Sequence, residues 1–150
     1  MSLLLGRRNN DWSFGLKIIH VIVDLEIGGA ELMLLRLVKF QSKCTVQHQV
    51  ISLTGLGEVG AMLRELGVDV FCLNMSKSPL KVISAVLKLR ALFKLLKPDL
   101  VHSWMYHSDL LAGLAAYSLG IRNIVWCIRS TDISKGRSNV TPVIRKICSL

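Results

Sequence analysis

Short strand-like and helix-like segments alternate along almost the whole chain, and this alternation restricts the fold more than any other feature. Five apolar runs have the length and composition of buried strands, and each is followed by a segment with helical spacing. We expect strands at 17–23, 46–53, 68–73, 100–103 and 123–128, and helices at 30–41, 58–66, 78–96, 108–119 and 141–150. The sequence therefore predicts an α/β fold with a doubly wound, mostly parallel sheet.

The connections between these segments also predict where a ligand binds. Right-handed crossovers favour the strand order 3-2-1-4-5, in which the winding direction changes between the first and fourth strands. Ligands of such sheets bind beyond the carboxyl ends of the strands at this point. The loops at 24–31 and 104–109 are therefore the candidate binding loops.

Length and composition indicate one domain in the cytoplasm. The chain has 150 residues and is 51% hydrophobic, which is enough for one core. We expect residues 1–16 to be a loose leader and 17–150 to form the domain. No apolar run reaches the roughly 18 residues of a membrane span, and Leu3–Leu5 is too short for a secretion signal. The formal charge of +9 favours an anionic partner.

The first candidate loop contains Gly28 and Gly29 between a strand and a helix. Adjacent glycines let backbone N–H groups approach an anion closely, and the positive end of the helix dipole favours negative charge there. The alternative is purely structural. In that interpretation the glycines form a tight turn and Glu31 interacts with the helix start.

The second candidate loop carries imidazole, indole and phenol side chains, which are suited to stacking on a sugar and binding its hydroxyl groups. His107 is the stronger functional candidate because we expect it in the loop or at the helix start. His102 lies in a strand flank, where a structural role is the alternative, and Trp104 follows it. Ser108 and Asp109 are interpreted as helix caps.

A third cluster begins with Arg129, just after the fifth strand, where a guanidinium group can hold a carboxylate or phosphate. An exposed structural arginine is the alternative. The glycine loop lacks G-x-G-x-x-G and no strand is followed by G-K-[S/T], which disfavours NAD or FAD and excludes a P-loop. The four cysteines are far apart and lack zinc-ligand spacing. We therefore expect no cofactor and no metal.

The longest predicted helix, at 78–96, is basic and contains no acidic residue. Its apolar residues occupy more than one face, which favours a core-packing helix whose lysines extend to solvent. A helix lying on an anionic membrane surface is the alternative. Nucleic acid is not an expected partner, because no basic stripe is interleaved with aromatic residues.

Three blocks, in this order, resemble the N-terminal domain of family 4 glycosyltransferases of the GT-B fold. They are IIHVIVDLEIGGAELMLLRLV, KPDLVHSWMYHSDLLAGLAA and IRSTD, within residues 17–132. The resemblance implies a Rossmann-like domain that mainly binds the acceptor, facing a second domain that mainly holds a nucleotide-sugar. It also implies retaining transfer of a hexose to an acceptor hydroxyl, without an essential metal.

The resemblance assigns roles to the candidate residues. Gly28 and Gly29 would approach the donor phosphate or sugar, His107 or its neighbours would contact the transferred sugar or the acceptor, and Arg129 would line the cleft. Many relatives carry a second histidine two residues after the one that matches His102, where this chain has Trp104. The identity of a catalytic histidine therefore stays open.

The resemblance also predicts which part of a family enzyme these 150 residues represent. The E-x7-E pair that contacts the donor in the family's second domain has no counterpart in them. We therefore expect a truncated enzyme that is inactive alone. The alternative is a non-catalytic Rossmann-like binding module that pairs with a separate donor-domain chain or a membrane surface. In either case the protein is expected in the cytoplasm, with possible peripheral contact at the inner face of the membrane.

Overall fold

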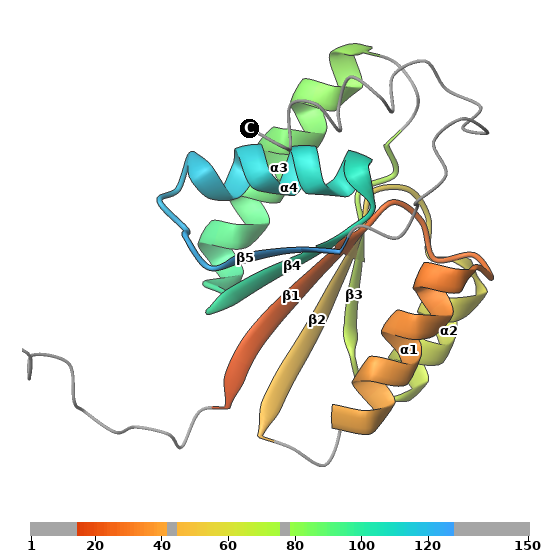
Figure 1. Cartoon of the computed structure of the whole chain (residues 1–150). Helices are drawn as coiled ribbons and strands as arrows, with labels where there is room; N and C mark the ends of the chain where they lie inside the picture. Colours follow the sequence, from red (N-terminus) through yellow and green to blue (C-terminus); the bar gives the residue numbers. More distant parts are fainter. Residues whose placement is uncertain (1–14, 42–44, 76–78, 128–150) are drawn as a thin grey trace, which may run out of the picture.

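The computed structural model describes residues 15–41, 45–75 and 79–127, which form a parallel sheet with helices on both faces (Figure 1). The strands are β1 (Leu16–Ile22), β2 (Val46–Ser52), β3 (Asp69–Cys72), β4 (Leu100–Trp104) and β5 (Ile124–Cys127). The helices are α1 (Gly29–Gln41), α2 (Gly57–Glu65), α3 (Pro79–Leu96) and α4 (Tyr106–Tyr117). The expected helix at 141–150 and nearly all of the expected leader lie outside the described residues.

The sheet confirms the predicted topology. Its strands are parallel and lie in the order β3-β2-β1-β4-β5. The central strand β1 pairs with β2 on one side and with β4 on the other, as in Ile19 opposite Gln49 and Val101. The winding direction therefore changes between β1 and β4, where the sequence predicts the binding loops.

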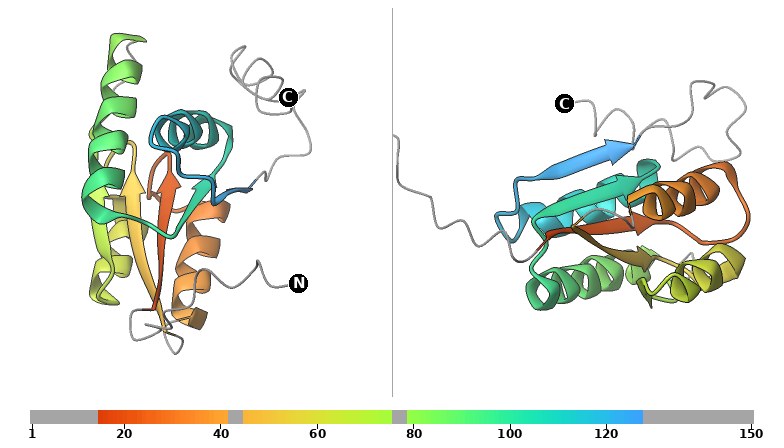
Figure 2. Two further views of the ribbon diagram at one scale, coloured as in Figure 1. Left: turned by 90° about the vertical axis from the view of Figure 1, so that its left-hand side faces the viewer. Right: turned by 90° about the horizontal axis from the view of Figure 1, so that it is seen from below.

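Each face of the sheet has its own core because helices cover both faces (Figure 2). One core lies between the sheet and helices α1 and α2, and includes Leu34 and Leu63. The other lies under α3 and α4, and includes Leu89 and Ala112. Burial on both faces explains why β1 and β2 are buried along five consecutive residues instead of alternating.

Glycine ends the second helix as its sequence predicts. Gly67 follows α2 with φ of 80°, its N–H bonds the carbonyl of Arg64 at 2.9 Å, and the N–H of Val68 bonds that of Leu63 at 3.1 Å. This is the Schellman arrangement, in which a left-handed residue satisfies the last carbonyls of a helix. Gly120, with φ of 71°, follows α4 in the same way.

The loop after β2 packs against the loop after β1 at Gly57. It begins α2 with φ of 56°, and a Cβ atom built on it would overlap the carbonyl group of Leu25 and the backbone nitrogen of Glu26. The Leu25 carbonyl accepts a hydrogen bond of 2.9 Å from the N–H of Val59, and the Leu25 side chain is fully buried. Gly57 therefore lets the first binding loop rest directly on the start of α2.

We predict that Gly57→Ala destabilises the domain by about 2 kcal/mol or more. The added Cβ would overlap backbone atoms, and alanine would also be strained in the left-handed conformation of this residue. Gly67→Ala is the matched control: its φ is also positive, at 80°, but no atom lies within 4 Å of the added Cβ. The control should lose only about 1 kcal/mol. Urea unfolding followed by circular dichroism measures both, and equal losses would show that the overlap at Gly57 relaxes freely.

Candidate functional site

The two predicted binding loops leave neighbouring strands at the same edge of the sheet. Strands β1 and β4 are parallel and paired, with Val21 opposite Ser103 near their carboxyl ends. The loop at 23–28 follows β1, and the turn at Met105 connects β4 to α4 (Figure 1). The fold therefore brings Gly28 and Gly29 to the edge that also carries His107, as the sequence predicts.

The two glycines of the first loop have different surroundings. Gly28 precedes α1, and its carbonyl accepts a hydrogen bond of 3.0 Å from the N–H of Leu32. A Cβ atom at Gly28 would overlap the carboxylate of Glu31, which is buried against it in the first turn of α1. Around Gly29, in contrast, no atom lies within 4 Å of the position of a Cβ.

This arrangement separates a structural glycine from an accessible one. Glu31 occupies the third helical position, where an acidic side chain folds back toward the helix start and offsets the positive end of the dipole. Gly28 provides the space for that side chain, as the structural interpretation requires. Gly29 is exposed and is the glycine that a ligand can reach.

The turn from β4 into α4 has a strained backbone. Met105 lies between them with φ of 71° and ψ of 154°, a region in which residues other than glycine are rarely found. Its N–H donates a hydrogen bond of 3.1 Å to the carbonyl of Cys127 in β5, and its carbonyl accepts one of 2.9 Å from the N–H of Asp109. No local sequence pattern marks a methionine with positive φ, so the strain at Met105 is visible only in the structure.

The interpretation of Ser108 and Asp109 as helix caps is wrong. Helix α4 begins at Tyr106, two residues earlier than expected, so both lie within its first turns. The Ser108 hydroxyl donates to the carbonyls of Trp104 and Met105, which fixes the turn. Asp109 is buried, and its Oδ1 accepts a hydrogen bond of 2.6 Å from the Ser103 hydroxyl.

Burial raises the pKa of Asp109 to about 6, although the hydrogen bond from Ser103 acts in the opposite direction. The other carboxyl oxygen, Oδ2, is buried and has no hydrogen-bond partner in the part of the chain that the structure describes. Burial therefore moves the titration of this carboxyl toward the mildly acidic range. Asp109 is therefore a titratable group just beneath the candidate edge. Its burial there cannot be read from the local sequence.

Trp104 joins a buried chain of hydrogen bonds that runs across three strands. Its indole Nε1–H donates to His20 Nδ1 at 3.3 Å, and His20 Nε2 lies 3.0 Å from His48 Nδ1. The His20 and His48 rings stack with centroids 5.3 Å apart. Burial, with further contributions from His102 and His48, lowers the pKa of His20 well below its usual value, and burial lowers that of His48.

These contacts define the tautomers of both histidines. An indole nitrogen can only donate, so His20 Nδ1 carries no proton, and the neutral ring carries its proton on Nε2. That proton is donated to His48 Nδ1, and neutral His48 is therefore protonated on its own Nε2. This last N–H is buried and has no partner among the described residues. The chain thus has a single direction, from Trp104 through His20 to His48.

The predicted site residues fall into three groups. His107 is the second residue of α4 and is exposed at the candidate edge, as is Gly29. His102 is half-buried in β4, with its ring centroid 4.6 Å from that of Trp104 and 5.2 Å from that of His20. Trp104 itself is only 2% exposed, so its predicted contact with a substrate stays a prediction. Arg129 lies outside the described residues.

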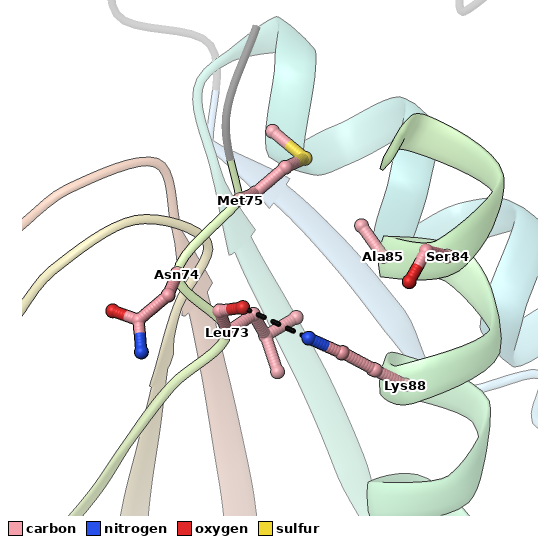
Figure 3. Close-up of a pocket in the computed structure, with 6 residues that line it drawn as sticks. All are labelled: Leu73, Asn74, Met75, Ser84, Ala85 and Lys88. Atoms are coloured by element: carbon pink, nitrogen blue, oxygen red, sulfur yellow. Dashed lines mark hydrogen bonds between the residues drawn. The ribbon is translucent and has the colours of Figure 1, made fainter. Parts of the chain in front are cut away.

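A hollow of about 200 Å³ lies at the same edge, between the loop after β3 and helix α3 (Figure 3). Lys88 reaches across it, and its ammonium group donates a hydrogen bond of 3.2 Å to the carbonyl of Leu73. Ser84 lies one helical turn earlier on the same side of α3. Asn74, with φ of 50°, closes the loop side.

The described part of the chain holds neither a grouped metal-ligand set nor a membrane-spanning helix. Among residues 15–41, 45–75 and 79–127, no three histidine, cysteine or acidic side chains are grouped so that they could hold a metal ion. None of the helices in these ranges is long and apolar enough to span a bilayer. Cys72 and Cys127 are free and half-buried thiols, while Cys44 and Cys148 are not described.

A parallel α/β sheet whose winding direction changes between β1 and β4 has the Rossmann-like fold. A family model identifies the group more closely, since Glycosyltransferase Family 4 matches residues 27–148. The chain belongs to this family. The match includes the glycine loop, the β4–α4 turn and the region around Arg129.

Solved structures with the same fold include MurG and several UDP-N-acetylglucosamine 2-epimerases. MurG from Acinetobacter baumannii is 20% identical, with a TM-score of 0.61 over 73% of this chain and 34% of its own. UDP-N-acetylglucosamine 2-epimerase from Methanocaldococcus jannaschii is 12% identical, with a TM-score of 0.65 over 88% and 36%. The Neisseria meningitidis 2-epimerase, solved with bound UDP-GlcNAc, is 16% identical, with a TM-score of 0.61 over 88% and 38%.

These neighbours are 12% to 20% identical to this chain, and they show its Rossmann-like α/β fold. The chain spans only 34% to 38% of the length of these three structures. A search of curated protein sequences finds no match.

We predict that Trp104→Phe destabilises the domain by about 1–3 kcal/mol, because it leaves His20 Nδ1 buried without a donor. Trp126→Phe is the control, since Trp126 is 40% exposed and lies on the edge strand β5. Nitrogen-15 NMR of the imidazole rings gives a second readout. In the wild type, His20 should be protonated on Nε2 alone, whereas a proton on Nδ1 would contradict the assigned chain.

Asp109 should make stability depend on pH in the mildly acidic range. Its pKa is about 6 in the folded protein and about 4 in an unfolded chain, so folding favours the protonated form. The protonated side chain therefore contributes its full stabilisation of the fold below about pH 4, and this stabilisation is lost as the pH rises through about 6. Asp109→Asn, which does not titrate, should therefore gain stability relative to wild type over this range. A constant difference in urea midpoints from pH 4 to 7 would refute the raised pKa.

Proposed function

We propose that this domain forms one wall of the sugar-transfer site of a glycosyltransferase, which moves a sugar from a nucleotide-sugar to an acceptor hydroxyl. Membership of Glycosyltransferase Family 4 supports the reaction class. The observation that carries the proposal is the single edge of the sheet at which the accessible glycine of the first loop and the exposed histidine of α4 lie together. The opposite wall would belong to a donor-binding domain.

Each candidate residue has a distinct part in this proposal. The backbone N–H of Gly29 would contact the donor diphosphate, while Gly28 would hold Glu31 and shape the loop. His107 would contact the transferred sugar or the acceptor, and Arg129 would line the cleft. His102 and Trp104 would act from below, by supporting the floor of the site. Backbone amides that are already oriented stabilise a departing diphosphate without reorganisation, and no metal or other cofactor is required for that role.

The sugar-transfer reaction needs both walls. A donor held on one side only would leave the developing charge in water and its reacting atoms poorly aligned. We therefore propose that the 150-residue polypeptide binds nucleotide-sugars weakly and does not transfer sugar without a donor-binding domain. We place the protein in the cytoplasm, in peripheral contact with the inner face of a membrane.

One observation favours a second candidate, a non-catalytic module that pairs with a separate donor-domain chain. Ile27 in the first loop is 61% exposed, and Met105 in the β4–α4 turn is 41% exposed, so apolar surface lies at the candidate edge. Such side chains are suited to contact another protein surface. Formation of a stable complex with a donor-domain chain, without any turnover by that complex, would favour this candidate.

Titration with UDP- and GDP-sugars tests the main proposal. We expect shifts of backbone amide signals confined to 24–31, to 104–109 and to the neighbourhood of Arg129, an affinity on the order of 1 mM, and no sugar transfer. Gly29→Asp should weaken binding at least severalfold, because it places a negative charge beside the diphosphate.

Gly55→Asp is the matched control, since Gly55 is an exposed glycine in the neighbouring loop and no atom lies within 4 Å of its added Cβ. It should bind like the wild type. Turnover by the 150 residues alone would disprove the requirement for a second domain. Amide shifts elsewhere on the domain, or equal effects of the two variants, would disprove the assigned site.

A further inference from the structure

Helix α3 has two apolar stripes on opposite sides, and only one of them contacts the rest of the domain. Ala85, Leu89 and Phe93 recur every four residues and are buried under the sheet. A second set, Ile83, Leu87 and Leu95, has spacings of four and eight residues, is offset from the first by two residues, and is 63%, 60% and 74% exposed. Residues spaced by four lie along one side of a helix, so these three form an outward apolar stripe.

Basic side chains accompany the outward stripe. Lys88 and Lys94 are exposed and Arg90 is half-buried, and α3 contains no aspartate or glutamate. On a helical projection, Arg90 and Lys94 fall beside Ile83 and Leu87, while Lys88 flanks the other side. We call this set, Ile83, Leu87, Lys88, Arg90, Lys94 and Leu95, the α3 face. In Figure 2 no element of the described fold covers the outer side of α3.

We propose that the α3 face docks on the surface of an anionic lipid bilayer. The proposal rests on the peripheral contact included in the proposed function, and it names the surface and the charge of the lipid. Exposed aliphatic side chains combined with cations, on a helix that lies along a surface, are the chemical signature of an interfacial membrane helix. The aliphatic groups enter the boundary of the acyl chains while lysine and arginine contact lipid phosphates.

Charge distinguishes a bilayer from the other possible occupants of this face. A symmetric dimer through α3 would place the same cations of two copies against one another, which is unfavourable in an interface with no acidic partner. A donor-binding domain would face the carboxyl edge of the sheet, whereas the α3 face covers the outside of a helix layer. The formal charge of +9 also attracts the whole chain to an anionic surface.

Lys88 links this face to the carboxyl edge of the sheet. Its ammonium group is held by the Leu73 carbonyl at 3.2 Å, in the hollow beside the loop after β3 (Figure 3). The remaining N–H donors of the ammonium group are available to a lipid phosphate. Because α3 starts at this edge, docking would bring the candidate site close to the lipid headgroups.

Vesicle flotation of the 150-residue protein tests the proposal, with no nucleotide-sugar present. We expect binding to vesicles that contain phosphatidylglycerol, weak binding to pure phosphatidylcholine, and release at high salt. Leu87→Gln should lower the partition coefficient roughly tenfold or more, because a buried aliphatic group is lost. Lys94→Gln should lower it about fivefold.

Two control variants replace one exposed apolar residue and one exposed basic residue on another helix. Phe40 in α1 is 83% exposed and Arg36 is exposed, so Phe40→Ser and Arg36→Gln should leave vesicle binding unchanged. Hydrogen exchange should show protection by anionic vesicles confined to α3. Equal binding by Leu87→Gln and the wild type, or equal loss in the Phe40→Ser control, would overturn the proposal. So would a dimer in solution that Leu87→Gln dissociates. Vesicle binding with no nucleotide-sugar binding would instead contradict the proposed function alone.

Discussion

The position of β1 between β2 and β4 is the constraint on which the rest of the structure depends. This pairing sets the point where the winding direction changes, and therefore where the loops after β1 and β4 meet. It also buries polar side chains of all three strands, which must find partners inside the sheet. A shift of β1 by one residue would move His20 to the other face and leave its partners unsatisfied. The chain from Trp104 to His48 therefore favours one register.

This buried interior also explains which groups are accessible at the carboxyl edge of the sheet. Two side chains of the second candidate loop, Trp104 and Asp109, are buried and bonded within the domain. The accessible groups are simpler: the backbone at Gly29 and the imidazole of His107. Transfer of a sugar depends mainly on positioning and on oriented backbone donors, so a rigid floor beneath a small number of accessible groups is consistent with that chemistry.

Local pattern was sufficient for the strand order and for the glycine stops after α2 and α4, whereas it left the structural role of Glu31 as one of two interpretations. It failed where contacts join distant segments. Trp104 bonds His20 across 84 positions, and no local rule reveals that its indole points inward. Ser108 and Asp109 look like caps because capping is local, yet a bond to Ser103 in the preceding strand determines the position of Asp109. In α3, apolar residues on two sides are consistent both with a core-packing helix and with a helix on a membrane surface. Only the packing in the structure shows which stripe is buried.

The two stripes of α3 connect the core to the proposed membrane contact. The same four-residue spacing that packs Leu89 beneath the sheet places Leu87 on the outside, so the helix needs only one geometry to serve both surfaces. An acceptor that is itself held in a bilayer would then meet the sugar donor at the carboxyl edge, beside the start of α3. Confinement of the domain and such an acceptor to one surface would replace a three-dimensional search by a search in the plane of the membrane. A face that contributes nothing to the chemistry can thus determine which acceptors reach the site.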